Sequence, residues 1–589
     1  MDPTLSNAEI ADALSELADL YELDGAVVHR VLAYRAAARA VRESAVSVAD
    51  LAIAGRAIEL PGVGATIQEK IGALLASGVI PAAARLRARF PAGLVEMTRL
   101  PGLGPRRARL LHDELGIASL VELREAAVAQ RIRTVRGLGP KLEARLLEAL
   151  EAARRVPPEA ERVLLPRALE LASAVMDGLR ALGPRDLKLS AAGSARRGCD
   201  SVKDIDLIAT TARPAALLAG LGELAEVAAV TASGSAGARA RLHAGPGLDL
   251  RVGAPSEYGN LLQHFTGSAA HNAALRERMV RRGLHVSEHG VLDDAGGLTR
   301  THRSERALYR HLGMSYIEPE LREDRGELEA AGAGGDGLPR LLTEQEIRGD
   351  LHCHTTASDG RASIAEMALA ARERGYEYLA ITDHSASHGF GNAVSAERLR
   401  RQIELVGEAN ETIEGIEVLA GSEVNILPDG ALDYADDVLA RLDWVIASVH
   451  TAFGMPEGQM TARVVAAIEH PLVDAIAHPT GRLIGQRRPY ALDMGAVIEA
   501  AAANGTMLEI NANARRRDLS EIDARAAARS GVPLVINSDA HAPASFDQMR
   551  WGVLTARRAW LRAGDVANTR TWAELASRRK RSGAQGGRR

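Results

Sequence analysis

Two groups of metal-ligand side chains, far apart in the sequence, indicate two centres with different chemistry. In the run DIDLIAT, Asp204 and Asp206 are two residues apart. This spacing places both carboxylates on one face of a β-strand. Hard oxygen ligands of this kind suit magnesium or manganese. The second group contains histidines and carboxylates, which occur in separate clusters between Asp350 and His541.

The motif GSARRG, residues 193–198, immediately precedes the strand with the two aspartates. A serine hydroxyl, an arginine and close approach of a glycine backbone are what a nucleoside triphosphate tail requires. In the run LDLRVG, Asp249 supplies a third carboxylate and shares one strand face with Arg251. Two metal ions bridged by three aspartates lower the barrier for attack of a 3′-hydroxyl on an α-phosphate. We therefore expect Asp204, Asp206 and Asp249 to be catalytic ligands of Mg²⁺ or Mn²⁺.

The second group repeats the same spacing twice. His352 and His354 form an H-x-H pair, and Asp539 with His541 repeats it in a later strand. Further residues complete a set of nine candidate ligands, namely Asp359, His384, Glu423, His450 and His478. Mixed imidazole and carboxylate ligands suit zinc or manganese, and such a cluster activates water to attack a phosphodiester or phosphomonoester.

A parallel α/β barrel is the element pattern expected to carry these nine ligands. Apolar runs alternate with helical spacers, and nearly every ligand lies at the end of its run, where barrel active sites assemble. The strand candidates are RGDLHCH, YLAITDHS, EVLAGSEVNI, WVIASVH, DAIAHP, TMLEINA and PLVINSDAH. Residues 156–256 contain short β-rich runs between amphipathic stretches and predict a separate α/β domain.

The N-terminal quarter contains an internal repeat of LPGVG, LPGLG and VRGLG, each followed by a helix-like run. Glycine permits a tight turn, and the N–H groups that open the next helix can receive a phosphate oxygen without reading any base. The alternative interpretation is that these turns only pack the helices. We expect the repeated glycines to bind the DNA backbone, at Gly62, Gly64, Gly102, Gly104, Gly137 and Gly139.

Composition limits the classes of protein. The 589 residues are enough for roughly three to five domains. No run of 18 or more apolar residues occurs, and the N-terminal segment is acidic where a secretory signal is basic, so neither export nor membrane insertion is expected. Only two cysteines occur, which favours the reduced cytoplasm. The formal net charge is -4, but residues 101–155 hold 11 basic against 7 acidic side chains, as a DNA-binding segment requires.

The front of the chain, about residues 5–320, resembles the DNA polymerase X family, of which polymerase beta is the familiar eukaryotic member. The resemblance rests on GSARRG followed by D-x-D, on the third aspartate and on FTGS at 265–268. It implies Gly193, Ser194 and Arg197 on the triphosphate and Asp204, Asp206 and Asp249 on the metals. It also implies a nucleotide pocket formed by Phe265, Gly267, Asn272 and Arg276.

The stretches VLAYRAA and GVGATIQEK resemble the small N-terminal domain that holds a 5′-phosphate in polymerase beta. Arg30, Tyr34 and Lys70 match, and Lys70 stands at the position of the Schiff-base lysine. Ala36 and Thr66 stand where that protein has lysines. Phosphate binding alone is therefore the alternative role for Lys70.

The C-terminal part, about residues 347–576, resembles the polymerase and histidinol phosphatase (PHP) domain, a distorted barrel that holds up to three metals. The resemblance implies a first site at His352, His354, Glu423 and Asp539. A second would use Glu423, His450 and His478, and a third Asp359, His384 and His541. Glu423 would then bridge two Zn²⁺ or Mn²⁺ ions.

The two resemblances together are typical of bacterial family X polymerases and predict a multidomain α and α/β protein. We expect helix-hairpin-helix domains at 1–88 and 89–155, a nucleotidyltransferase palm at 156–258 and a thumb-like domain at 259–320. A linker at 321–346, a distorted (β/α)7 PHP barrel at 347–576 and a basic tail at 577–589 complete the chain.

The expected function is gap-filling DNA synthesis in repair, with a 3′-to-5′ exonuclease in the barrel. Base excision repair is the expected setting, and end joining is a further one. The expected partners are gapped or primed duplex DNA and deoxynucleoside triphosphates, with no membrane, and a monomer is expected. One alternative is a PHP phosphatase or abasic-site endonuclease that the front half delivers to DNA. Another is a non-catalytic repair scaffold.

Overall fold

The computed structural model describes residues 5–98, 100, 102–155, 162–333, 337–388 and 392–580. These residues form two compact units. The first unit contains Met1–Val163, Leu169–Ala191 and Lys203–Pro255, and the second contains Leu164–Ala168, Ala192–Val202 and Ser256–Arg589. The predicted domain boundary at 155/156 and the predicted basic tail from residue 581 onward lie outside the described residues.

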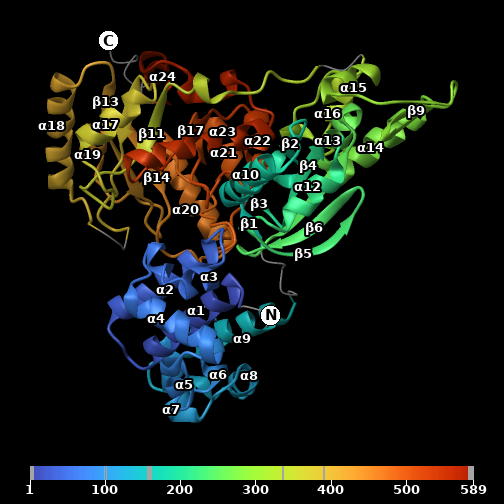
Figure 1. Cartoon of the computed structure of the whole chain (residues 1–589). Helices are drawn as coiled ribbons and strands as arrows, with labels where there is room; N and C mark the ends of the chain where they lie inside the picture. Colours follow the sequence, from blue (N-terminus) through green and yellow to red (C-terminus); the bar gives the residue numbers. More distant parts are fainter. Residues whose placement is uncertain are drawn as a thin grey trace. The chain divides into compact units, whose positions relative to one another are not determined.

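The first unit begins with a set of short helices (Figure 1). Ser6 caps the first helix in a capping box with Glu9, and Ile10, Leu14 and Leu17 recur at helical spacing on its buried face. One apolar core extends from Ile10 to Leu150, so the two predicted helical domains share a core. The helices are α1 (Asn7–Leu23), α2 (Val28–Glu43), α3 (Val48–Ile53), η1 (Ala57–Glu59), α4 (Ala65–Ser77), α5 (Pro81–Arg87), α6 (Ala92–Thr98), α7 (Pro105–Leu115), α8 (Leu120–Val128), η2 (Ile132–Thr134) and α9 (Pro140–Arg155).

The rest of the first unit is the predicted α/β domain. Its sheet has the order β2-β4-β7-β6-β5, in which β4 and β7 are parallel and the other neighbours are antiparallel. Along β7, Leu248, Leu250 and Val252 are buried, while Asp249 and Arg251 lie on the other face. The elements of this region are α10 (Leu165–Leu182), β2 (Lys188–Ala191), β4 (Asp204–Thr210), α12 (Pro214–Leu221), β5 (Val227–Gly234), β6 (Gly237–Leu242) and β7 (Gly247–Gly253).

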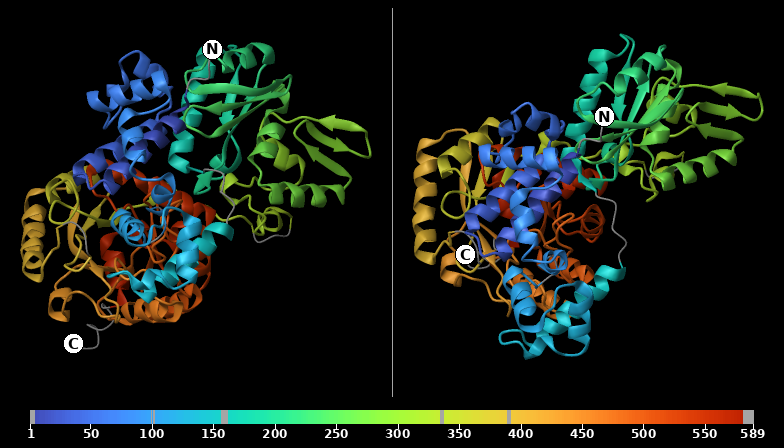
Figure 2. Two further views of the ribbon diagram at one scale, coloured as in Figure 1. Left: turned by 90° about the horizontal axis from the view of Figure 1, so that it is seen from below. Right: turned by 60° about the horizontal axis from the view of Figure 1, so that its bottom comes forward.

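The second unit contains the thumb-like region, with a small antiparallel sheet of order β10-β9-β8. This sheet extends outward beside α14 in both views of Figure 2. The elements of this part of the unit are β1 (Val163–Leu164), α11 (Gly193–Arg196), β3 (Ser201–Val202), η3 (Pro255–Glu257), α13 (Tyr258–Thr266), α14 (Ala269–Val280), β8 (Leu284–Ser287), β9 (Gly290–Asp293), β10 (Leu298–Arg300), α15 (Glu305–His311), η4 (Pro319–Leu321), α16 (Glu327–Ala331) and η5 (Glu344–Glu346).

The predicted linker at 321–346 packs in part against the thumb-like region. Leu328, Ala331 and Leu341 belong to the apolar core of the thumb-like region. The side chain of Glu327 is fully buried and lies 2.6 Å from Nδ1 of His271. The sequence predicted a linker here, but these buried contacts attach the segment to the thumb-like region. Residues 334–336 lie outside the described residues.

The barrel follows the prediction, because each predicted strand forms in the described chain. The strands are parallel and lie in chain order from β11 to β17. A bridge between Cys353 and Ala540 joins the first strand to the segment after the last, so the seven-stranded sheet nearly closes. The strands are β11 (Gly349–Cys353), β12 (Tyr378–Ile381), β13 (Glu417–Asn425), β14 (Trp444–Ser448), β15 (Ala475–Ile476), β16 (Met507–Asn511) and β17 (Leu534–Asn537).

Alternate residues of these strands face two separate apolar cores. Tyr378 and Ala380 belong to one core, whereas Leu379 and Ile381 belong to the other. Helices surround the strands, with α18 on the outside of the barrel (Figures 1 and 2). They are α17 (Ile364–Glu373), α18 (Ala396–Thr412), α19 (Asp436–Leu439), α20 (Glu457–Glu469), α21 (Met494–Asn504), α22 (Glu521–Arg529), η6 (Pro543–Gln548), α23 (Met549–Arg558), η7 (Ala563–Asp565), η8 (Ala567–Thr569) and α24 (Trp572–Arg578). Among the described helices, none has the length and apolar character needed to cross a membrane.

Candidate metal centres and nucleotide-binding loop

The ends of the barrel strands bring the nine predicted ligands into one cluster. Glu423, at 1% exposure of its side chain, lies at the centre. Its Oε1 is 2.9 Å from Nε2 of His478 and 3.5 Å from Nε2 of His450. Its Oε2 is 2.8 Å from Nδ1 of His384 and 3.4 Å from Nε2 of His352. This arrangement suits a carboxylate shared between ions.

Eight of the nine predicted ligands, all except His478, fall into overlapping groups in which all ligand atoms lie within 4.8 Å of one another. The groups are His354, Asp359, His384 and His541; then His352, His354 and Asp539; then His384, Glu423 and His450. His354 and His384 each belong to two groups, whereas the sequence assigned each of them to one metal. The division of ligands among individual ions stays a prediction.

The donor atoms fit a metal cluster. Nε2 of His352 and both ring nitrogens of His354 are buried and have no hydrogen-bond partner among the described residues. Buried polar atoms of this kind cost free energy unless another group satisfies them. The backbone of two predicted ligands is also strained, because His478 has a φ of 30° and Asp539 a φ of 55°. Imidazole and carboxylate donors together suit zinc or manganese.

Sequence reasoning missed the residue that orients these ligands. Glu509, in the middle of β16, is fully buried, and its Oε1 lies 2.7 Å from Nδ1 of His352. Its Oε2 accepts a hydrogen bond of 2.7 Å from the backbone N–H of His478. A carboxylate on the far nitrogen of a metal-binding histidine fixes the ring and its tautomer. The signal in the sequence was an acidic residue inside the apolar strand TMLEINA.

Two further residues support the cluster. Asp383, adjacent to His384, accepts hydrogen bonds from the backbone N–H and the hydroxyl of Thr355 at 2.8 and 2.6 Å. His388 was missed: its ring stacks on that of His384 with centroids 4.6 Å apart. Nδ1 of His388 lies 2.7 Å from the carbonyl oxygen of Ser385. These contacts hold the segment that carries His384.

The predicted catalytic aspartates lie on two parallel neighbouring strands of the first unit. Asp206 on β4 is directly opposite Asp249 on β7, and Asp204 is opposite Gly247. A Cβ atom at Gly247 would lie 2.6 Å from Oδ1 of Asp204, so glycine there leaves room for the carboxylate. Asp249 pairs with Arg251 at 2.8 Å. The register therefore brings the second and third carboxylates together.

The GSARRG motif forms α11 and the following turn in the second unit. Arg196 pairs with the buried Glu305 at 2.6 Å. Burial alone would raise the pKa of Glu305, but Arg322 and Arg196 overcome it and lower the pKa to about 2. The sequence assigned no role to Glu305.

Arg197 is held beside the FTGS motif. Its Nη1 donates to the carbonyl oxygen of Thr266 at 2.6 Å. A Cβ atom at Gly267 would lie 3.2 Å from the same nitrogen, so the two motifs are in close contact. On α14, Asn272 donates to the carbonyl oxygen of His264 at 2.7 Å. Arg276, one turn later, donates to the carbonyl oxygen of Asn272 at 3.1 Å.

The repeated hairpins share one backbone geometry. The first glycine of each has a φ of 80° or 88°, at Gly62, Gly102 and Gly137. This left-handed conformation favours glycine. The second glycines, Gly64 and Gly104, are the N-caps of α4 and α7, with open space where a side chain would lie. Gly139 directly precedes α9 and is open in the same way.

The three residues assigned to phosphate binding near the N-terminus differ in exposure. Tyr34 is only 5% exposed, and burial raises the pKa of its phenol to about 12. The guanidinium of Arg30 lies over the ring of Tyr21, at 5.4 Å. Lys70 is partly exposed on α4. Their contacts with DNA stay predictions.

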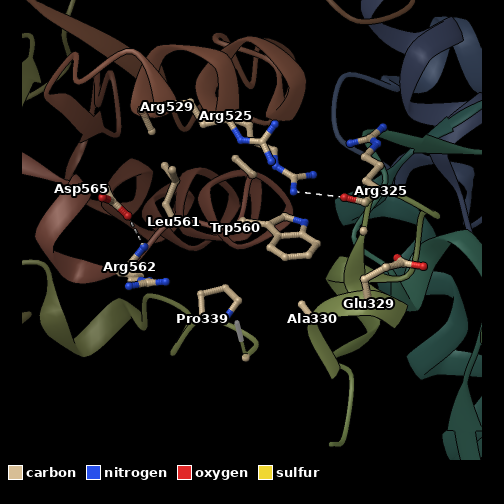
Figure 3. A pocket seen from close by; sticks show the side chains of 14 residues that line it. Arg325, Glu329, Ala330, Pro339, Arg525, Arg529, Trp560, Leu561, Arg562 and Asp565 are labelled. Atoms are coloured by element: carbon tan, nitrogen blue, oxygen red, sulfur yellow. Dashed lines mark hydrogen bonds between the residues drawn. The ribbon is translucent and has the colours of Figure 1, made fainter. Parts of the chain in front are cut away.

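A cavity of about 530 Å³ lies elsewhere in the second unit (Figure 3). Arg325, Arg525, Arg529 and Trp560 contribute to its lining. The guanidinium of Arg525 stacks over the ring of Trp560 at 4.1 Å. None of the predicted site residues lines this cavity.

These features are typical of a protein that combines a polymerase-beta-like part with a PHP barrel. Four sequence families match the chain: a helix-hairpin-helix domain at residues 5–80, a SAM-like helix-hairpin-helix tandem at 94–152, the DNA polymerase beta thumb at 261–323 and the PHP domain at 350–512. The DNA polymerase/3′-5′ exonuclease PolX of Bacillus subtilis (strain 168) is 38% identical over 576 residues. That alignment covers 98% of this chain and 99% of the relative. The chain belongs to the PolX family of DNA polymerases.

Other relatives match only about a third of the chain. A probable phosphatase of Thermoanaerobacter sp. (strain X514) is 33% identical over 34% of this chain and 81% of its own length. A probable phosphatase of Acetivibrio thermocellus is 34% identical over 33% of this chain and 78% of its own length.

Proposed function

We propose that this chain fills short gaps in duplex DNA and also removes nucleotides from 3′ ends. The observation that carries the proposal is the alignment with a polymerase and exonuclease over nearly the whole of both chains. Each of the two activities then has a domain with suitable side chains. Gapped or primed duplex DNA and deoxynucleoside triphosphates are the proposed substrates. DNA repair in the cytoplasm, by a monomer, is the proposed setting, with base excision repair first and end joining second.

For nucleotide addition, the proposed ligands of Mg²⁺ or Mn²⁺ are Asp204, Asp206 and Asp249. Ser194 and Arg197 would bind the triphosphate, and the FTGS motif would contribute to the nucleotide pocket. When bound, the ions supply the electrostatic stabilisation that the attacking 3′-hydroxyl and the departing pyrophosphate require. The protein's own part is to fix the carboxylates on adjacent strands, as the pairing of Asp206 with Asp249 supports.

For degradation, the nine barrel residues are the proposed ligands of up to three Zn²⁺ or Mn²⁺ ions. Such ions activate water for attack on a phosphodiester. Glu509 would orient His352, and Glu423 would serve two ions. Helix-hairpin-helix glycines would hold the DNA backbone while either site acts.

The alternative is a phosphatase or abasic-site endonuclease delivered to DNA by the front half. The probable phosphatases support it, but they match only about a third of this chain. In that alternative the helix-hairpin-helix and thumb regions would serve only to bind DNA, and the predicted nucleotide site would have no role. A gap-filling polymerase with a nuclease uses every matched region, which favours the proposal.

The test uses a labelled primer on gapped duplex DNA, with Mg²⁺ and Mn²⁺ in separate reactions. With deoxynucleotides the unaltered protein should extend the primer, and without them it should shorten it. Asp206→Ala should abolish extension and keep shortening, because the two clusters are on different domains. His352→Ala should do the reverse and should lower the content of bound metal.

Matched controls lie outside both clusters. His285→Ala changes a half-exposed histidine, and Asp177→Ala changes an exposed aspartate. Both variants should keep both activities. Loss of both activities in folded Asp206→Ala would contradict the assignment of extension and shortening to separate domains. Release of phosphate from monoesters without extension or shortening would favour the phosphatase.

A further inference from the structure

Barrel arginines contact the turn that ends the GSARRG motif, and both belong to the same compact unit. Arg558, at the end of α23, has a side chain that is 5% exposed. Its Nη1 donates to the carbonyl oxygen of Arg197 at 2.7 Å and to Oε1 of Glu323 at 3.0 Å. The same Glu323 oxygen accepts from Nε of Arg197 at 3.0 Å. Arg558 therefore reaches both the backbone and, through Glu323, the guanidinium of Arg197.

Two more barrel arginines bind the next residues of the turn. Arg517 is 1% exposed, and its Nη1 donates to the carbonyl oxygen of Gly198 at 2.9 Å. The same nitrogen lies 3.1 Å from Oδ1 of Asp200. Nη2 of Arg482 lies 2.9 Å from the other oxygen of Asp200. The turn thus receives charged donors at two carbonyls and one carboxylate.

The backbone of the turn also packs directly on the barrel. Gly198 has a φ of 70°, and a Cβ atom there would lie 2.7 Å from Cγ of Leu554 on α23. Any other residue there would have to displace the Leu554 side chain and adopt a backbone conformation that favours glycine. Glycine at the end of GSARRG therefore meets a requirement of the barrel as well as of the motif.

The pattern is more specific than adhesion between two domains. Burying an arginine costs several kcal/mol unless it is paired in good geometry. Adhesion alone would be served by apolar side chains, which carry no such cost. Here the buried arginines donate to the carbonyl oxygens of Arg197 and Gly198. Arg558 is also linked through Glu323 to the side chain of Arg197, which is expected to bind the triphosphate.

We propose that Arg558 and Arg517 of the PHP barrel are positioning residues for nucleotide addition, because they fix the turn and the side chain of Arg197. This inference rests on the proposed polymerase activity. Neither arginine touches the nucleotide; each acts through residues 197–200. The barrel thus contributes to the polymerase reaction as well as to degradation.

The expected effect is on nucleotide use. Displacement of a positioning group by about 1 Å can cost as much as about 100-fold in rate. Arg558→Met should raise the KM for a deoxynucleotide about tenfold or more. Arg558→Lys keeps one donor and should recover part of that loss. The affinity for gapped DNA and the rate of 3′ shortening should stay within about twofold of the unaltered protein, because neither depends on the turn.

The experiment measures insertion of one nucleotide into a gap by full-length Arg558→Met, Arg558→Lys and Arg517→Met. Equilibrium binding of the deoxynucleotide to protein on dideoxy-terminated gapped DNA supplies a second readout without turnover. The matched control is Arg525→Met, which removes an arginine of the same domain from the cavity beside Trp560 (Figure 3). Rates of 3′ shortening in each variant report whether the barrel is folded.

The outcomes are distinct. The proposal is supported if Arg558→Met and Arg517→Met bind the nucleotide more weakly and Arg558→Lys recovers part of that loss. Arg525→Met should bind the nucleotide as tightly as the unaltered protein. The proposal would be overturned if Arg558→Met and Arg517→Met had the same nucleotide KM and affinity as Arg525→Met, or bound the nucleotide more tightly than the unaltered protein. If Arg558→Met does not fold, Arg558→Lys decides by the same two readouts. Failure of the unaltered protein to add a nucleotide would overturn the proposed function itself.

Discussion

Replacement of Glu509 by glutamine should empty part of the barrel cluster without touching a predicted ligand. Oε1 of Glu509 faces Nδ1 of His352 at 2.7 Å and accepts from the amide of Asn537 at 2.9 Å. Oε2 accepts from the N–H of His478 at 2.7 Å and the amide of Asn511 at 3.0 Å. Both oxygens therefore act as acceptors for two groups. In either orientation, the glutamine NH₂ group would meet two donors.

The magnitude follows from those contacts. Loss of a carboxylate that orients a metal-binding histidine typically lowers metal affinity about 10- to 100-fold. That factor corresponds to about 1.4 to 2.8 kcal/mol. Glu509→Gln keeps the shape of the side chain, so the packing of β16 should survive. The loss should therefore appear in metal binding and not in the fold.

The assay is titration of metal-stripped protein with zinc and, separately, manganese, with bound metal and 3′ shortening measured at each concentration. Half-maximal values should move about 10- to 100-fold higher in Glu509→Gln, and excess metal should restore shortening. Nucleotide addition should be unchanged. Glu499→Gln, an exposed position on α21, is the control. Titration curves that coincide for the two variants would refute the orienting role of Glu509.

Two further predictions concern DNA binding and pH. Gly104 has a φ of -70° and open space at its Cβ position, so Gly104→Val should fold normally yet weaken binding to all DNA sequences alike. Its salt dependence between about 50 and 200 mM should be shallower in fluorescence anisotropy, and an unchanged affinity and slope would mean that this turn only packs helices. The pKa of Glu305 falls from 4.5 to about 2, so its ion pairs contribute roughly 3 kcal/mol to stability above pH 4.5, and this is lost as pH falls toward 2. Calorimetry should show a weaker acid dependence for Glu305→Gln, and equal dependence in both proteins would contradict this ion-pair energy.

The sequence predicted the barrel and its cluster because both signals are local. Nearly every predicted ligand follows or ends an apolar run of strand length, so its position at a strand end could be predicted from the local sequence alone. The three hairpins could be predicted for the same reason, because a turn residue with a φ near 80° is usually glycine and marks the turn in the local sequence.

The rest depends on partners far away in the chain. Glu509 and His352 are 157 residues apart, and the residues around Glu509 in the sequence do not indicate which residue it contacts. The linker was predicted from its glycine-rich composition, but Glu327 contacts His271 across 56 residues, and the neighbouring Leu328 packs into the core of the thumb-like region. Arg517 reaches Gly198 across 319 residues, a contact that no local pattern encodes.

Arg516 and Arg517 are neighbours in the chain but contact different sites, and this affects how the protein can be truncated. Nε of Arg516 lies 3.6 Å from Oδ2 of Asp539, while its neighbour contacts Gly198 and Asp200. A fragment cut before the barrel would keep every aspartate of the palm but would lose the donors of the turn. A fragment containing only the barrel would expose an arginine that is now buried. A fragment without the barrel would therefore understate the rate of nucleotide addition by the whole protein, even though it keeps all three predicted catalytic aspartates.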